Sequence, residues 1–190
     1  MQVLSPSIAL LQTRRSLKPA ELAGPGPSPS ELDTLLTIAA RVPDHGKLAP
    51  WRFIVFEGES QLKAGAAIAS AFLAKYPDAK PVQIEFEHRR LTRAPLVIAV
   101  VSRAAPHLKI PEWEQVLSAG AAAMSLVIAA HALGFAAAWI TEWYAYDRGV
   151  LDALGLKPHE RIAGFVHVGR PTHVPQDRPR PALADIVTHF

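Results

Sequence analysis

The uncharged stretch "QVLSAGAAAMSLVIAAHALGFAAAWIT", residues 115–141, decides the fold of this chain. Its length alone would allow a membrane-spanning helix. Three features argue against a membrane span. The stretch contains many Ala residues and is broken at Gly134, and two glutamates precede it where a basic flank would set an orientation. The pattern therefore predicts a buried helix over about 114–133, a strand over 136–141 and no membrane association.

A helix that is apolar on all sides must be buried in a core or in a subunit interface. A chain of 190 residues builds a core of limited size, so it has limited room to bury such a helix alone. We therefore expect a single domain over residues 1–190 that forms a homodimer.

The segments around this stretch mix helices and strands. Ser5-Pro6 and Ser28-Pro29 begin helices, with serine as the N-cap and proline at the first helical position. The expected strands cover 51–58, 94–102 and 161–171, and further helices cover about 60–75 and 147–155. The charged segment 77–93 gives no clear prediction. Without a regular βαβ repeat, this order favours an α+β, three-layer arrangement around a mixed sheet.

Composition excludes several classes of site. The chain has no cysteine, which removes disulfides, thiolate nucleophiles and cysteine-based metal sites. The absence of cysteine and of a secretory signal pattern is consistent with a cytoplasmic protein. The histidines show no spacing that predicts a metal site, and no Gly-rich phosphate loop occurs. The net charge of +3 comes from scattered basic residues, which favours small anionic ligands over nucleic acid.

Three short basic motifs stand out: "RRSLK" at 14–18, "RVPDHGKLAPWRF" at 41–53 and "RPRP" at 178–181. Arginine provides forked donors, and serine a further hydrogen bond, that suit a phosphate. Each motif also has an ordinary interpretation, as a basic last helical turn, a solvated loop and a stiff basic tail. The residues alone leave both interpretations open.

Together with "RAPLVIAVV" at 93–101, "KIPEWEQ" at 109–115 and "IAGFVHVGRP" at 162–171, these motifs make the chain resemble the nitroreductase family. The resemblance is to its short-chain, YdjA-like NAD(P)H nitroreductase subgroup. It implies a central mixed, mostly antiparallel sheet flanked by helices, an intertwined homodimer, and FMN at the dimer interface. It also implies ping-pong reduction of a nitroaromatic or quinone-like acceptor by NAD(P)H. The alternative is a flavin-binding protein without turnover, such as a carrier or sensor.

The resemblance also implies a set of cofactor-binding residues, grouped in four places along the chain. They are Arg14, Arg15, Ser16 and Lys18; Arg41 and His45; Trp139, Ile140 and Thr141; and Arg180. The first and last groups would hold the phosphate and ribityl chain, the second would come from the facing subunit, and the third would line the flavin. The family resemblance also connects 130–135 with NAD(P), although that segment is apolar. No residue is predicted to be catalytic, because the flavin carries the chemistry.

Two features of these groups remain open. Ile140 stands where a relative has a basic residue, which removes a charge from the flavin edge and bears on substrate preference. Asp44 and Lys47 in the second motif have no assigned role.

Overall fold

The computed structural model describes residues 5–190. Its sheet consists of β1 (Leu22–Ala23), β2 (Trp51–Phe56), β3 (Leu96–Ser102), β4 (Ala136–Ile140) and β5 (Arg161–Pro171). The order is β1-β5-β3-β2, and β4 also pairs with β5. The mostly antiparallel character is confirmed, since within residues 5–190 every pairing between strands is antiparallel.

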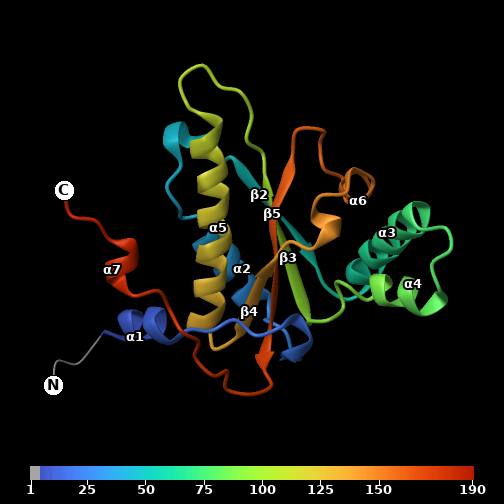
Figure 1. Cartoon of the computed structure of the whole chain (residues 1–190), viewed down its shortest axis with the longest axis horizontal. Helices are drawn as coiled ribbons and strands as arrows, with labels where there is room; N and C mark the ends of the chain where they lie inside the picture. Colours follow the sequence, from blue (N-terminus) through green and yellow to red (C-terminus); the bar gives the residue numbers. More distant parts are fainter. Residues whose placement is uncertain (1–4) are drawn as a thin grey trace.

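Helices cover both faces of the sheet, which gives the expected three-layer α+β fold (Figure 1). One face carries α2 (Pro29–Ala39) and α5 (Glu112–Ala132). The other carries α3 (Glu59–Lys75) and α6 (Arg148–Ala153), and α4 (Pro81–His88) packs on α3. The remaining elements are α1 (Pro6–Thr13), α7 (Leu183–Ile186), η1 (Pro19–Glu21), η2 (His45–Lys47) and η3 (Trp143–Ala145).

Local signals begin the helices where the sequence predicts. The Ser28 hydroxyl accepts a hydrogen bond from the Glu31 amide at 3.3 Å, and the Glu31 carboxylate accepts one from the Ser28 amide at 2.7 Å. This reciprocal pair satisfies two amides that the first helical turn leaves unpaired. Asp147 caps α6 in a similar way through the Val150 amide, at 3.0 Å.

Strand β3 lies at the centre of the core and is buried along its whole length. Leu96, Ile98 and Val100 belong to the cluster under α2 and α5, whereas Val97 and Val101 belong to the cluster under α3 and α6. A strand covered on both faces needs an apolar residue at every position, which explains the continuous apolar run.

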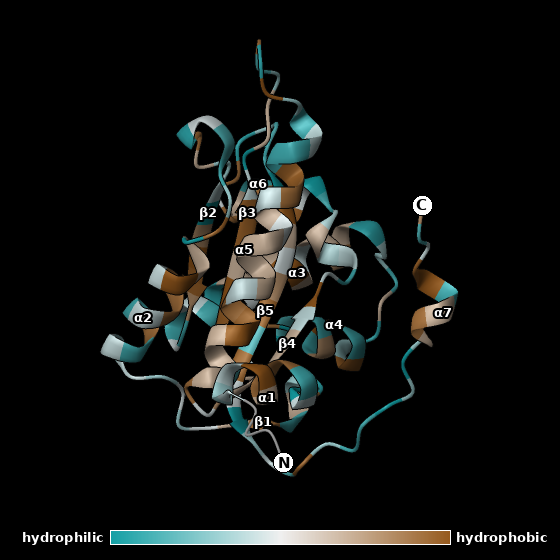
Figure 2. Cartoon of the chain, turned by 90° about the vertical axis from the view of Figure 1, so that its left-hand side faces the viewer, coloured by the Kyte–Doolittle hydropathy of each residue, from teal (hydrophilic) through white to brown (hydrophobic). Residues whose placement is uncertain are grey.

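Helix α5 is less enclosed than predicted. It is long and apolar enough to cross a bilayer, but half of its most apolar window is buried inside the protein, so this is weak evidence for a span. One side is open: Trp113 is 68% exposed and Leu117 is 52% exposed. Figure 2 shows α5 running uncovered across the front of the molecule. The single chain thus leaves one side of this helix exposed, which agrees with the limited room expected for burying it alone; its burial in a dimer stays a prediction.

Segment 77–93, whose structure was not predicted, forms α4 and a turn. The buried amide of Gln61 on α3 donates to the carbonyl oxygens of Leu91 at 2.9 Å and Ala94 at 2.8 Å, which fixes this turn. At Gly65 the helices approach so closely that an added Cβ would lie 2.0 Å from the His88 carbonyl oxygen. The apolar C-terminal helix α7, by contrast, stands away from the body of the chain (Figure 2).

Candidate functional site

The N-terminal arginine string lies against the C-terminal end of α5. Arg14 is the C-cap of α1. The His131 ring, in the last turn of α5, places Nε2 2.9 Å from the carbonyl oxygen of Arg15. Leu17 is buried, whereas Ser16 and Lys18 are exposed. The string is thus anchored by its backbone and Leu17, with polar side chains on either side.

The C-terminal arginines return to the same place. Arg15 Nε donates to the carbonyl oxygen of Gln176 at 3.2 Å and lies 3.7 Å from the Asp177 carboxylate. Nη2 of Arg180 lies 3.8 Å from the same carboxylate. Burial, and then the positive charges of Arg180, Arg15 and Arg178, lower the pKa of Arg14 below its usual value.

We call Arg14, Arg15, Arg178 and Arg180 the arginine cluster. Three of its members were predicted site residues, and the structure brings them together. The fourth, Arg178, was not predicted, although the "RPRP" motif contains it. Because the neighbouring positive charges lower the pKa of Arg14, an anion bound at the cluster would stabilise its charged form.

A second group of predicted residues lies in the loop after α2. Arg41 is exposed there. The carboxylate of Asp44, which had no assigned role, accepts hydrogen bonds from the amides of Leu48 at 3.0 Å and Ala49 at 2.9 Å. Lys47 and Ala49 adopt positive φ angles of 56° and 45°. Asp44 therefore holds a tight loop in a conformation that its residues would not adopt on their own.

This loop is fastened to the N-terminal half of α5. His45 Nδ1 lies 2.7 Å from the Glu114 carboxylate. The Ser118 hydroxyl donates to the Pro43 carbonyl oxygen at 2.6 Å and accepts from Trp51 Nε1 at 3.1 Å. Beside these contacts lies a cavity of about 320 Å³, whose lining residues are Pro43, His45, Glu114, Leu117, Ser118 and Ala121.

The third group ends β4. Trp139 is 39% exposed, and Ile140 and Thr141 are half-buried. Trp139 Nε1 donates to the Ala163 carbonyl oxygen at 3.1 Å. The indole lies so close over Gly164 that an added Cβ would be 1.9 Å from Nε1. This fixes the Trp139 ring on the sheet face that α5 also covers.

The predicted groups do not all meet in one chain. Arg15 contacts His131 at one end of α5, and His45 contacts Glu114 at the other. These two α5 residues are separated by about 25 Å along the helix axis. In the apolar segment 130–135, Phe135 is buried under the Arg170 guanidinium, 4.0 Å from the ring centroid, whereas Ala132 and Gly134 are exposed.

The family model of the "Nitroreductase family" matches residues 11–170, which is most of this chain. The chain belongs to the nitroreductase family. It is 35% identical over 165 residues to the Escherichia coli K12 protein named "Putative NAD(P)H nitroreductase YdjA", covering 87% of this chain and 88% of the relative. It is 36% identical over 164 residues to a "Putative NAD(P)H nitroreductase" of Haemophilus influenzae, covering 86% and 87%. The YdjA-like resemblance is confirmed.

Solved structures show the same nitroreductase fold. A nitroreductase-like protein from Bacillus cereus superposes with a TM-score of 0.84 at 20% identity, over 100% of this chain and 98% of that chain. A nitroreductase from Desulfovibrio desulfuricans, solved in complex with FMN, superposes with a TM-score of 0.75 at 22% identity, over 99% and 98%. At these identities the likeness concerns the fold.

Proposed function

We propose that this nitroreductase is an FMN-dependent oxidoreductase that uses NAD(P)H to reduce an oxidised small molecule, nitroaromatic or quinone-like, by a ping-pong mechanism. The observation that carries the proposal is the arginine cluster, which forms at the C-terminal end of α5 from segments some 160 residues apart. The names of the curated relatives support the NAD(P)H part of the proposal. The FMN complex of a structural neighbour supports the cofactor.

The residues present fit an FMN phosphate. Two of the four guanidinium groups, those of Arg15 and Arg180, share one nearby carboxylate, Asp177, and the neighbouring arginines disfavour the charge of Arg14. A phosphate would provide the missing negative charge and accept forked hydrogen bonds from arginine. Ser16, exposed beside the cluster, adds a hydroxyl donor. Among the cluster residues, Arg14 is the partly buried cation that gains most from such a partner.

The remaining residues of the chain bind and orient. FMN, when bound, supplies the redox chemistry, by accepting a hydride from NAD(P)H and passing electrons to the acceptor. Trp139, Ile140 and Thr141 form an apolar wall against the flavin ring, and Trp139 is pinned by its hydrogen bond to Ala163. Lys18, the exposed cation at the end of the "RRSLK" motif, would offset negative charge on the flavin ring.

The same proposal includes a homodimer. The loop with Arg41 and His45 lies about 25 Å along α5 from the arginine cluster of its own chain. Two-fold packing of α5 against its copy would bring the loop of one subunit to the cluster of the other. The open side of α5 suits such packing, since it presents the exposed Trp113, Val116 and Leu117. Small residues continue this side beyond Leu117, which lets two helices approach closely.

The test is an absorbance spectrum of the purified protein, followed by anaerobic addition of NADH or NADPH. We expect a yellow protein whose flavin absorbance is lost within seconds with one donor, and then restored by a quinone or nitroaromatic. If the bound flavin stays oxidised with both donors, the reductase function is excluded and the alternative, a flavin carrier or sensor, remains. A protein that neither contains nor binds FMN would overturn the proposal. Cytoplasmic localisation is part of the proposal, since both donors are intracellular metabolites.

A further inference from the structure

The backbone of Glu142 has an unusual conformation. This residue follows Thr141 directly and has φ 41° and ψ 171°. Non-glycine residues rarely occupy this region, and they remain there only when the surrounding structure holds them. At its four tight glycine turns, among them Gly134 and Gly155, the chain meets the need for positive φ without a side chain. At position 142, as at Lys47 and Ala49, a non-glycine residue has the positive φ, and here the side chain makes the contacts that hold the backbone.

The carboxylate of Glu142 is held from three directions. Arg90 Nη1 donates to Oε1 at 2.9 Å, and Arg93 donates to both oxygens, to Oε1 at 3.2 Å. The Tyr144 hydroxyl donates to Oε2 at 2.8 Å. Burial alone would raise the pKa of Glu142, but the hydrogen bonds from Arg93 and Tyr144 outweigh it and lower the pKa, so the group stays charged.

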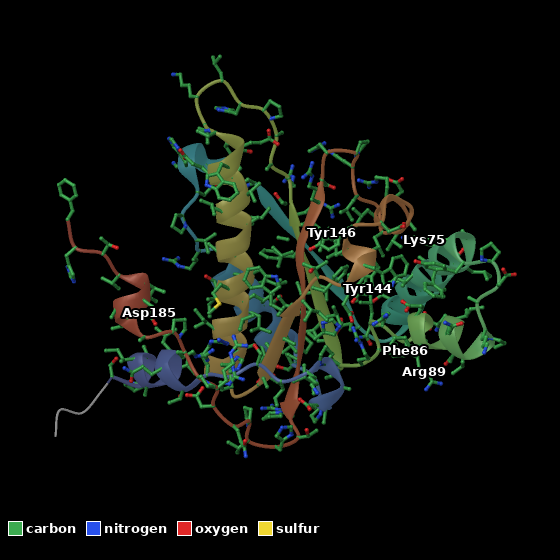
Figure 3. The ribbon with its side chains drawn as sticks, viewed as in Figure 1. Lys75, Phe86, Arg89, Tyr144, Tyr146 and Asp185 are labelled. Carbon is green, nitrogen blue, oxygen red and sulfur yellow. The ribbon has the colours of Figure 1, made fainter. Side chains whose placement is uncertain are left out.

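These partners are themselves fixed. Arg90 also forms two parallel bonds to the buried Glu87, at 2.9 Å and 2.7 Å, and Glu87 accepts from Trp143 Nε1 at 2.8 Å. Arg93 Nε donates to the carbonyl oxygen of Arg90 at 2.8 Å. Figure 3 shows Tyr144 between the sheet and the α3–α4 pair. We call the Glu142 carboxylate with Arg90, Arg93 and Tyr144 the clamp. It joins the turn after α4 to the end of β4, two segments about 50 residues apart in sequence.

The clamp acts where the sheet no longer controls the backbone. The last residue of β4 in the ladder is Ile140, which pairs with Phe165. Beyond it, the dihedral angles of Glu142 decide which way the Thr141–Glu142 peptide points. We propose that Glu142 is a positioning residue: its clamped carboxylate holds this strained backbone and so fixes the neighbouring Thr141, the one residue of the Trp139–Thr141 wall that lies outside the β4–β5 ladder, in its place toward the flavin. This inference rests on the proposed function.

The experiment compares Glu142→Gly with Glu142→Gln. Glycine tolerates the backbone conformation but removes the clamp, so Thr141 becomes mobile while Trp139 and Ile140 stay in the ladder. We expect Glu142→Gly to bind FMN several-fold more weakly and to lose a measurable part of the visible circular dichroism of the bound flavin. Glutamine keeps the size and one acceptor oxygen, and it should restore most of the dichroism. If Glu142→Gly does not fold, a dichroism change in Glu142→Gln beyond that of the control carries the test.

The matched control is Glu160→Gln, which removes another buried carboxylate held by an arginine, outside the clamp. It should lower thermal stability without changing the flavin dichroism. Unchanged FMN affinity and dichroism in both Glu142 variants would overturn the positioning role while the proposed function stands. If the wild-type protein binds no FMN, the proposed function fails first, and the inference fails with it.

Discussion

His131 holds the N-terminal segment against α5: its Nε2 lies 2.9 Å from the carbonyl oxygen of Arg15, at the C-terminal end of this helix. Arg15 in turn contacts Gln176 and Asp177 of the C-terminal tail. One histidine on the longest helix thus fixes the arginine string beside the tail, and the arginine cluster follows from it.

The arginine cluster is tested by removing the member that was not a predicted site residue. We expect Arg178→Ala to weaken FMN binding about tenfold or more, because one charge-assisted hydrogen bond to phosphate contributes about 1.5–3 kcal/mol. Arg14→Ala should weaken it at least as much, since Arg14 is more buried. Fluorescence titration of the apoprotein with FMN measures both. The control is Arg89→Ala, an exposed arginine that pairs with Glu85 on α4; FMN affinities equal to the control would contradict the phosphate role.

The open side of α5 is tested with a charge. Leu117→Glu should convert the protein to a monomer, because a glutamate at a helix–helix contact would be buried without a partner. FMN binding should fall with it, since the loop from the other subunit is lost. Sedimentation velocity gives the oligomeric state. Val82→Glu, at a 72% exposed apolar position on α4, is the control and should leave both properties unchanged. A dimeric Leu117→Glu protein would move the interface elsewhere.

The ion pair between Arg52 and the buried Glu160 predicts that the protein loses stability in acid. Arg52 donates at 2.9 Å and 2.8 Å to the Glu160 carboxylate, and these bonds, with the Lys157 amide, lower the pKa of Glu160 to about 2. A carboxylate with a lowered pKa stabilises the fold above its unfolded pKa of 4.5, and this contribution is lost as pH falls toward 2. With Arg52 partly exposed, the contribution is about 1–2 kcal/mol.

Urea unfolding between pH 7 and pH 2.5 measures this pH-dependent contribution to the free energy of unfolding. Glu160→Gln should be less stable than wild type at pH 7 by that amount, and the difference should shrink as pH falls below 4.5. Glu59→Gln, which removes an exposed carboxylate paired with Lys63, should follow wild type throughout. A difference between Glu160→Gln and wild type that does not change with pH would show that the charge contributes nothing.

His167 predicts a different pH window. It is fully buried in β5, and neither ring nitrogen has a hydrogen-bond partner among the described residues. Burial, and then the charge of Arg93, lower its pKa to about 4. Between about pH 6.5 and pH 4 the unfolded chain therefore binds a proton that the folded chain does not. The free energy of unfolding falls as the pH is lowered through this window.

His167→Leu removes both the unpaired polar atoms and this proton linkage. We expect it to be more stable than wild type by about 1–2 kcal/mol at pH 8, and by more at pH 5. Thermal unfolding at the two pH values checks this. His189→Gln, in the exposed tail, is the control. A Leu variant that is less stable at both values would mean that the imidazole has a polar partner in solution, such as a buried water.

Much of the fold was predictable because its signals are local. Caps at Ser28 and Asp147, the continuous apolar run of β3 and the break at Gly134 each act over a few residues, and each element formed there. Segment 77–93 was not predictable, because α4 depends on the close approach at Gly65 and on the buried amide of Gln61. Both contacts join α3 to residues that lie further along the chain.

For the candidate site, the motifs and the family resemblance selected the residues, and folding decided their arrangement. No pattern in the sequence brings Arg178 to Arg14, clamps Glu142 between Arg90 and Arg93, or leaves one side of α5 open. These relationships depend on contacts between distant segments, whose closure is set by packing of the whole core. The sequence by itself determined the elements and the chemical groups; the tertiary structure decided which groups meet and which surface is open to a second subunit.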